Sequence, residues 1–137
     1  MEFSEFKKEW MSHFAKGIPK HKIEKYVIST GNYIWHVFSW ELLPKGSFLE
    51  GDAAREAFDS LWTYTKENAV YIEPFEDEGT FSMTQKEAKS ENLDKHVEIY
   101  AMARDHSWTY IKTHEGDLCG PYFYMPKKEE ETEKKGK

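Results

Sequence analysis

Large apolar side chains near the start of the chain recur with the period of an α-helix. Gaps of three, four and four residues place four of them on one helical face: Phe3, Phe6, Trp10 and Phe14. We expect Ser4 or an earlier residue to cap this helix. We expect Gly17 to end it in a left-handed conformation.

A second helix is predicted after Pro19, which suits the first turn. Its buried face would hold Ile23, Tyr26 and Val27. Thr30-Gly31-Asn32 ends it, and the aromatic and β-branched segment Tyr33–Trp40 is typical of a strand. Both faces of this strand are apolar, so we expect it to be central and covered on both sides. His36 would then lie on one face of a buried strand.

The middle of the chain contains the longest helical pattern. Apolar residues at helical spacing predict a helix over Asp52–Thr65, with Asp52 as its N-cap. Thr84 and Glu87 have the spacing of a capping box. They precede Lys86–Lys95, which has little apolar face and is predicted as a surface helix.

Three further segments predict strands: Ala69–Glu73, Val97–Ala103 and Trp108–Thr113. The last two flank a turn at residues 105–107 and form a hairpin. A three-residue loop would give four cross-strand pairs: Arg104–Trp108, Met102–Tyr110, Tyr100–Lys112 and Glu98–His114. We favour this register over the one that pairs Ala103 with Trp108, because all four pairs are chemically complementary. In it, the carboxylate of Glu98 favours the charged imidazolium of His114.

These elements predict an α+β protein with a single domain over residues 1–126. Its antiparallel sheet of four or five strands would pack with three N-terminal and mid-chain helices. Trp35 and Phe58 are predicted core residues. The segment Lys127–Lys137 has no aromatic or branched apolar residue, so we expect it to be a disordered charged tail.

Composition narrows the class of protein. Charged residues make up 32% of the 137 residues. No apolar run approaches the roughly 20 residues that a membrane-spanning helix needs. The N-terminal sequence lacks the apolar core of a signal peptide, and the chain has one cysteine. We therefore expect a cytoplasmic protein with no membrane association.

The charge of the chain bears on its partners. The net charge is -6, and the tail carries five lysines against four glutamates, so residues 1–126 carry -7. A body of this sign repels phosphate backbones, so we expect no nucleic-acid binding. A basic protein partner fits this charge, although solubility alone is the more common reason for it. The pattern specifies no oligomeric state.

The segment Trp108–Tyr124 holds the densest candidate chemistry. His114, Glu115 and Cys119 are the candidate catalytic residues, since an imidazole beside a thiol can form a nucleophile pair. Cys119-Gly120-Pro121-Tyr122 invites comparison with the Cys-Gly-Pro-Cys motif of thioredoxins, but a second cysteine and a following helix are lacking. We therefore favour a buried structural cysteine beside a Gly-Pro turn.

The same three residues, together with His36, are ligand types that suit zinc. The paired Cys-x-x-Cys or His-Glu-x-x-His spacing of zinc sites is not found. We expect neither a bound metal nor a cofactor. By itself, His36 is more often a hydrogen-bonded core residue than a ligand.

Several segments together resemble a known family: Trp35-His36-Val37-Phe38-Ser39, Gly51-Asp52-Ala53-Ala54-Arg55, and Thr113-His114-Glu115 running to Cys119-Gly120-Pro121-Tyr122-Phe123. The chain resembles a family of small proteins of unknown function from Bacillus-type bacteria, over roughly Trp10 to Tyr124. The resemblance implies a bacterial cytoplasmic protein and supplies no reaction. The residues that it implies are shared are His36, Gly51, Asp52, Arg55, His114, Glu115, Cys119 and Gly120.

Two classes of function remain open. The first is a non-enzymatic binding or interaction module with an acidic, aromatic-rich surface, which we favour because no catalytic motif is present. The second is a small-ligand or enzymatic site at the end of the sheet, built from His36, His114, Glu115 and Cys119. Convergence of those four side chains in one pocket would favour the second class. The residues predicted to bind a ligand or partner are His36, Asp52, Arg55, Trp108, Tyr110, His114 and Tyr122.

Overall fold

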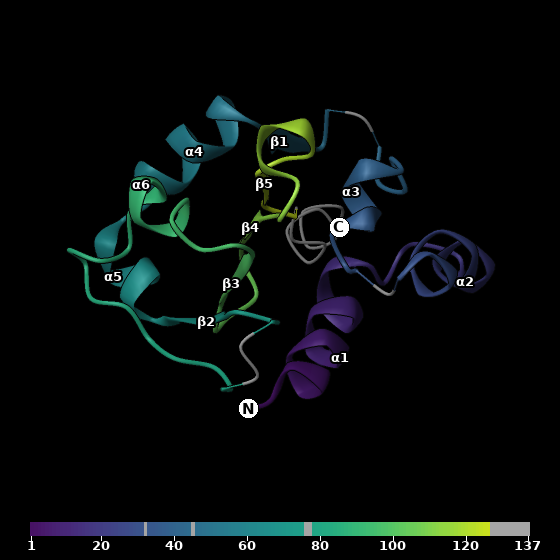
Figure 1. Ribbon diagram of the computed structural model, residues 1–137, viewed down its shortest axis with the longest axis horizontal. Helices are drawn as coiled ribbons and strands as arrows, with labels where there is room; N and C mark the ends of the chain where they lie inside the picture. Colours follow the sequence, from purple (N-terminus) through teal and green to yellow (C-terminus); the bar gives the residue numbers. More distant parts are fainter. Residues whose placement is uncertain (32, 45, 76–77, 127–137) are drawn as a thin grey trace, which may run out of the picture.

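A five-stranded antiparallel sheet lies at the centre of the computed structural model, which describes residues 1–31, 33–44, 46–75 and 78–126 (Figure 1). The strands are β1 (Phe48–Glu50), β2 (Ala69–Ile72), β3 (Ile99–Ala103), β4 (Thr109–Lys112) and β5 (Tyr122–Tyr124). Their spatial order is β1-β5-β4-β3-β2. The hairpin of β3 and β4 therefore lies inside the sheet, and the C-terminal strand β5 separates it from β1.

Helices cover both faces of the sheet (Figure 1). One face carries α1 (Phe3–Phe14), α2 (Lys20–Tyr26) and α3 (His36–Ser39), and the other carries α4 (Asp52–Asp59), α5 (Thr63–Glu67) and α6 (Ser90–Leu93). Alternate residues of a strand face opposite ways, so two cores form. Tyr100 of β3 belongs to the core that includes Phe6 of α1, and Ala101 to the core that includes Phe58 of α4. The predicted α+β class is confirmed.

The first two helices form where the sequence predicts them. Glu2 caps α1, and its side chain and that of Glu5 make a reciprocal capping box. The indole of Trp10 donates a hydrogen bond of 2.8 Å to the Thr109 hydroxyl, which fastens α1 to β4. The prediction for Gly17 is wrong, because α1 ends at Phe14 with Ala15 as its C-cap, and the φ of Gly17 is not positive.

The predicted central strand Tyr33–Trp40 is wrong. The segment forms turns followed by the short helix α3. Its buried residues Ile34, Val37 and Phe38 have the spacing of one helical face. A short, wholly apolar run fits a buried helix as well as a buried strand, so the sequence pattern alone could not separate them. His36 is consequently the first residue of a helix.

The predicted helix Asp52–Thr65 is two helices. It breaks at Trp62, whose backbone is extended and whose surface is 72% exposed, so α5 starts anew at Thr63. Asp52 is the first residue of α4 rather than its cap. The cap is Gly51, whose φ of 70° lies in the left-handed region that favours glycine.

The predicted surface helix over Lys86–Lys95 is much shorter. The capping box forms, with the Thr84 amide donating to Glu87 at 2.9 Å and the Glu87 amide donating to Thr84 at 3.3 Å. This capping box stabilises a single turn at residues 85–87, and the helix α6 begins later, at Ser90. The few apolar residues of this segment leave little surface to bury, which limits the helix to four residues.

The favoured hairpin register is wrong by one residue. The Ala103 amide donates to the Trp108 carbonyl at 3.1 Å, and Met102 lies opposite Thr109. The loop therefore holds four residues, and His106 within it has a φ of 62°. The Asp105 carboxylate accepts a hydrogen bond from the Ser107 amide at 3.0 Å, which stabilises this turn.

No helix among the described residues is long and apolar enough to cross a membrane. The predicted tail Lys127–Lys137 lies outside the described residues, as does Asn32 of the predicted helix end.

Candidate functional site

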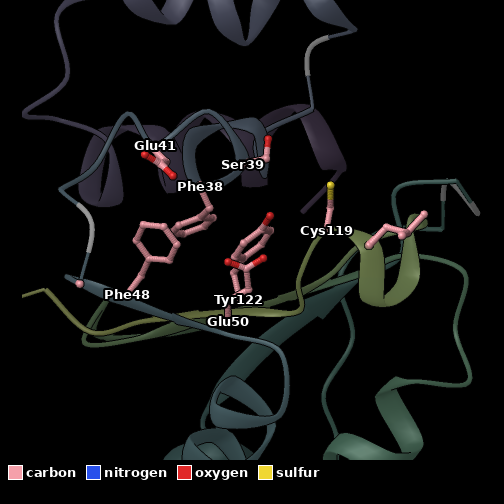
Figure 2. Close-up of a pocket in the computed structure, with 9 residues that line it drawn as sticks. Phe38, Ser39, Glu41, Phe48, Glu50, Cys119 and Tyr122 are labelled. Atoms are coloured by element: carbon pink, nitrogen blue, oxygen red, sulfur yellow. The ribbon is translucent and has the colours of Figure 1, made fainter.

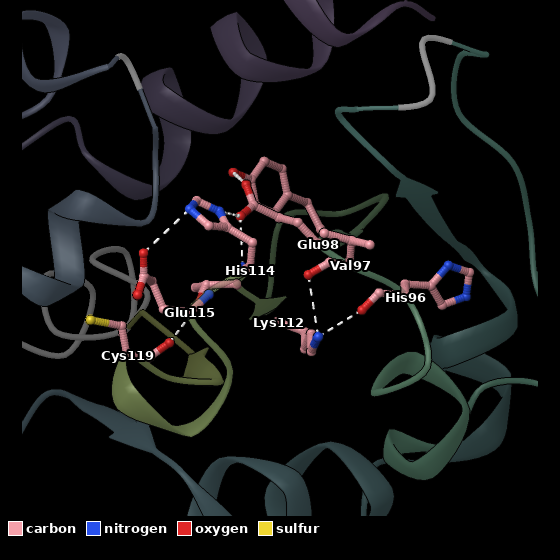
Figure 3. Close-up of polar contacts among 9 residues, drawn as sticks. His96, Val97, Glu98, Lys112, His114, Glu115 and Cys119 are labelled. Carbon is pink, nitrogen blue, oxygen red and sulfur yellow. Dashed lines mark hydrogen bonds and ion pairs between the residues drawn. The ribbon is translucent and has the colours of Figure 1, made fainter.

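The candidate site lies at the end of the sheet where β3 begins and β4 finishes (Figure 3). Ile99 pairs with Lys112 in the last rung of the hairpin. Glu98 directly precedes that rung, and His114 follows it by two residues. Antiparallel pairing thus brings together two residues that are 16 positions apart in the sequence.

The buried carboxylate of Glu98 holds the site together. Its side chain has no exposed surface. Its Oε1 atom accepts hydrogen bonds from the His114 amide at 2.9 Å and from His114 Nδ1 at 2.6 Å. The Tyr100 hydroxyl donates to Oε2. Burial first, and then the nearby charge of Glu98, raise the pKa of Tyr100, so its hydroxyl keeps the proton that it donates.

His114 is held in one orientation. Because Nδ1 donates to a carboxylate, Nε2 is the ring nitrogen that faces outward, and it lies 3.4 Å from Oε2 of Glu115. Three rings surround the imidazole, with centroids at 5.2 Å for Tyr33, 5.7 Å for Trp35 and 5.7 Å for Phe75. The His114 side chain is still 28% exposed, so solvent and ligands reach it.

His36 joins the site from the start of α3. Its ring lies 4.6 Å from the ring of Trp35. Its Nδ1 atom is 2.7 Å from the hydroxyl of Thr30. Burial is the main cause that lowers the pKa of His36, and the nearby His114 lowers it slightly further. A hydrogen bond to the backbone of Tyr26 and the charge of Glu98 act in the opposite direction, but the net pKa is lowered. The structure therefore brings together three of the four predicted residues: His36, His114 and Glu115.

Cys119 is the exception. Its thiol points away from the imidazole of His114 (Figure 3). Burial first, and then the carboxylates of Glu115 and Glu50, raise the pKa of the thiol, which disfavours the reactive thiolate. The Thr113 hydroxyl donates to the Cys119 carbonyl at 2.5 Å and fixes the turn. At Gly120, with a φ of 97°, a side chain would crowd the ring of Tyr122 at 3.1 Å.

The thiol instead faces a separate pocket of about 490 Å³ between α3 and the strands β1 and β5 (Figure 2). The pocket is lined by Phe38, Ser39, Glu41, Gly46, Phe48, Glu50, Leu118, Cys119 and Tyr122. Tyr122, which was predicted to bind a ligand or partner, forms part of its wall. The remainder of that ring is buried in the core.

The other predicted binding residues lie elsewhere. Arg55 makes ion pairs with Asp52 at 2.9 Å and with Asp94 at 3.0 Å. The second of these pairs links α4 to the C-cap of α6. Trp108 and Tyr110 are buried in the core beside Phe58 and present no surface to a ligand.

The chemistry available at the site is proton exchange and hydrogen bonding through the outward Nε2 of His114. Among the described residues, no group of three or more histidine, cysteine or acidic side chains could hold a metal ion. The carboxylate of Glu115 is the group beside Nε2. No hydroxyl or thiol within the described residues is hydrogen-bonded to that nitrogen.

Sequence reasoning did not assign Tyr33 and Phe75 to the site. Their contacts depend on how the loops fold back over the sheet, and no pattern in the sequence signals that. Glu98 did carry a signal. It directly precedes β3 and alternates with Tyr100 and Met102, so a buried charged residue continues the face of a strand and needs a partner.

Comparison with known proteins places the chain in a family. No curated protein and no solved structure gives a significant match. A family model described as a domain of unknown function, DUF4275, matches residues 3–123. Because this match takes in β1 to β4, most of β5 and all the helices, the chain belongs to the DUF4275 family.

Proposed function

We propose that the protein is a non-enzymatic binding module for a basic protein partner. The contact surface is the His114 face, which consists of Tyr33, Phe75, His114 and Glu115. The observation that carries this proposal is the fixed imidazole of His114, held by the buried carboxylate of Glu98 and surrounded by rings.

The His114 face has the features of a protein-binding surface. Phe75 is 52% exposed and lies beside His114, so it can serve as an aromatic anchor. The imidazole cannot rotate without breaking its bond to Glu98, so little side-chain entropy is lost on binding. The exposed carboxylate of Glu115 and the net charge of -6 favour a partner of positive charge.

A site for acid–base chemistry is the alternative. The Glu98–His114 pair supports it, because a carboxylate on Nδ1 orients a histidine as a general base. Two observations weigh against it. The carboxylate of Glu115 lies beside Nε2, where a general base would need a hydroxyl or thiol to activate, and the thiol of Cys119 faces another pocket.

The proposal is tested by affinity capture from cells of the native host with three immobilised proteins. They are the wild type, the double variant Phe75→Ser/Glu115→Gln, and the control Trp62→Ser/Tyr64→Ser. The control removes an exposed aromatic pair at the start of α5, on the other face of the sheet. We expect a basic protein to be captured by the wild type and the control, and lost with the Phe75/Glu115 variant.

The captured protein is then purified and its affinity measured at rising salt. We expect the dissociation constant to increase with salt, because attraction between opposite exposed charges is screened. Equal capture by all three proteins, or an acidic partner, would contradict the proposal. If the wild type catalyses a reaction on the captured partner or on a small molecule, loss of that reaction in His114→Asn would favour the alternative.

A further inference from the structure

We propose that the pocket between α3 and the strands β1 and β5 is a binding site for a guanidinium group. The site goes beyond the proposed function, since none of its walls belongs to the His114 face. Its volume of about 490 Å³ falls within the range of small-molecule sites. Three aromatic rings and a carboxylate from different elements face the same space (Figure 2).

The alternation of side chains in β1 builds one wall. Phe48 and Glu50 are two residues apart, so both point to the same face of the sheet. Glu50 lies opposite Tyr122 in the β1–β5 ladder, which sets its carboxylate beside the phenol ring. From above, Phe38 of α3 packs on both rings, with centroids 5.0 Å from Phe48 and 5.0 Å from Tyr122.

The carboxylate of Glu50 is available to a ligand. It makes no hydrogen bond or ion pair with any residue in the described part of the chain. Its charge reaches the groups around it, because it contributes to raising the pKa of both Cys119 and Tyr122. A cation placed in the pocket would offset this charge.

Guanidinium fits this combination better than other charged groups. It is planar and weakly hydrated, stacks on aromatic faces, and pairs with a carboxylate through two parallel hydrogen bonds. A primary ammonium is more strongly hydrated and would lose more solvation on entering a pocket walled by Phe38 and Phe48. An anion would be repelled by Glu41 and Glu50, both of which line the pocket.

Isothermal titration with three probes of matched shape tests the site: n-butylguanidinium, n-butylammonium and the neutral n-butylurea. We expect saturable binding of n-butylguanidinium to the wild type, and at least about tenfold weaker binding of the other two. Glu50→Gln should weaken n-butylguanidinium binding by about tenfold, because it removes the charge and keeps the shape. Glu91→Gln, a change at an exposed position of α6 on the other face of the sheet, should leave the affinity unchanged.

A second readout uses the thiol inside the pocket. Saturating n-butylguanidinium should change the rate of Cys119 alkylation by iodoacetamide in the wild type, because it covers the thiol and offsets the charge of Glu50, and n-butylurea should not offset that charge. Absence of saturable binding, equal binding of the urea, or full affinity in Glu50→Gln would overturn the proposal.

The guanidinium group could belong to a free small molecule or to an arginine side chain of a protein. Comparing the affinities of agmatine and N-acetyl-arginine amide distinguishes these two sources. Tighter binding of agmatine assigns the site to a free small molecule. Tighter binding of the blocked arginine assigns it to an arginine side chain of a protein. Either result supports a guanidinium site, and failure of both probes to bind counts against it.

Discussion

Nδ1 of His114 lies 2.6 Å from Oε1 of Glu98, a carboxylate with no exposed surface. The same oxygen accepts the backbone amide of His114, so one buried group fixes both the ring and the chain after β4. Tyr100 donates to the other oxygen. A buried charge with three donors is retained in the fold, whereas the same charge without them would be strongly destabilising.

Replacing Glu98 by glutamine should therefore lower the free energy of unfolding by about 2–4 kcal/mol. The amide group has one acceptor oxygen where the carboxylate had two, and it carries no charge, so the charge-assisted hydrogen bonds from His114 and Tyr100 are weakened or lost. Urea denaturation at neutral pH measures the loss. Glu115→Gln is the matched control, because Glu115 is partly exposed and lies at the longer distance of 3.4 Å from His114. A loss for Glu98→Gln as small as that of the control would show that the buried carboxylate does not anchor the loop.

The sequence predicted the elements with a clear period. The gaps between Phe6, Trp10 and Phe14 can only be one face of a helix, and α1 forms there. The segment Tyr33–Trp40 was mistaken for a strand because its residues are apolar on every side, which removes the periodicity that separates helix from strand. The break at Trp62 depends on how α5 packs against the sheet, which no local pattern records.

The sequence also predicted part of the candidate site, namely the contact between Glu98 and His114. The contact between Glu98 and His114 exists although the predicted register is wrong, because both residues lie beyond the last rung of the ladder. There the chain is free to adjust, and the need to pair a buried carboxylate decides the outcome. The direction of the Cys119 thiol is set by the turn at Gly120 and could not be read from spacing.

The stability of the fold should depend on pH through His36. Burial lowers the pKa of His36 below its ordinary value, so the unfolded chain takes up a proton before the folded chain does. The contribution to stability is fully present above about pH 6.5 and is lost as the pH falls through the lower pKa of the folded state. Urea denaturation of the wild type and His36→Asn at about pH 8, 7, 6 and 5 isolates this effect. The stability advantage of the wild type should shrink toward acid pH, and an advantage that is constant or grows would contradict the assignment.

Phe58 is expected to contribute strongly to the stability of the core between the sheet and α4, called the second core; the core that includes Phe6 is the first. It has no exposed surface, stacks on Tyr110 with ring centroids 4.6 Å apart and contacts the edge of Trp108. Phe58→Ala should lower the free energy of unfolding by about 3–5 kcal/mol, and Trp35→Ala should do the same in the first core. The control Trp62→Ala, at an exposed position, should change it by about 0.5 kcal/mol or less. Chemical denaturation that gives less than about 1 kcal/mol for Phe58→Ala would remove this residue from the core.

Cys119 should react slowly with iodoacetamide in the native protein. Its raised pKa leaves less thiolate at neutral pH than an ordinary thiol has, and the thiolate is the reactive form. The rate should lie below that of a model cysteine peptide, and unfolding in urea should restore the peptide's rate. Burial alone would also slow the reaction, so the electrostatic part needs its own variant. Glu50→Gln removes one of the two carboxylates that raise the pKa, and it should speed alkylation by roughly twofold to fivefold with the fold unchanged. A native rate above that of the peptide would instead indicate an activated nucleophile, and an unchanged rate in Glu50→Gln would show that this carboxylate does not act on the thiol.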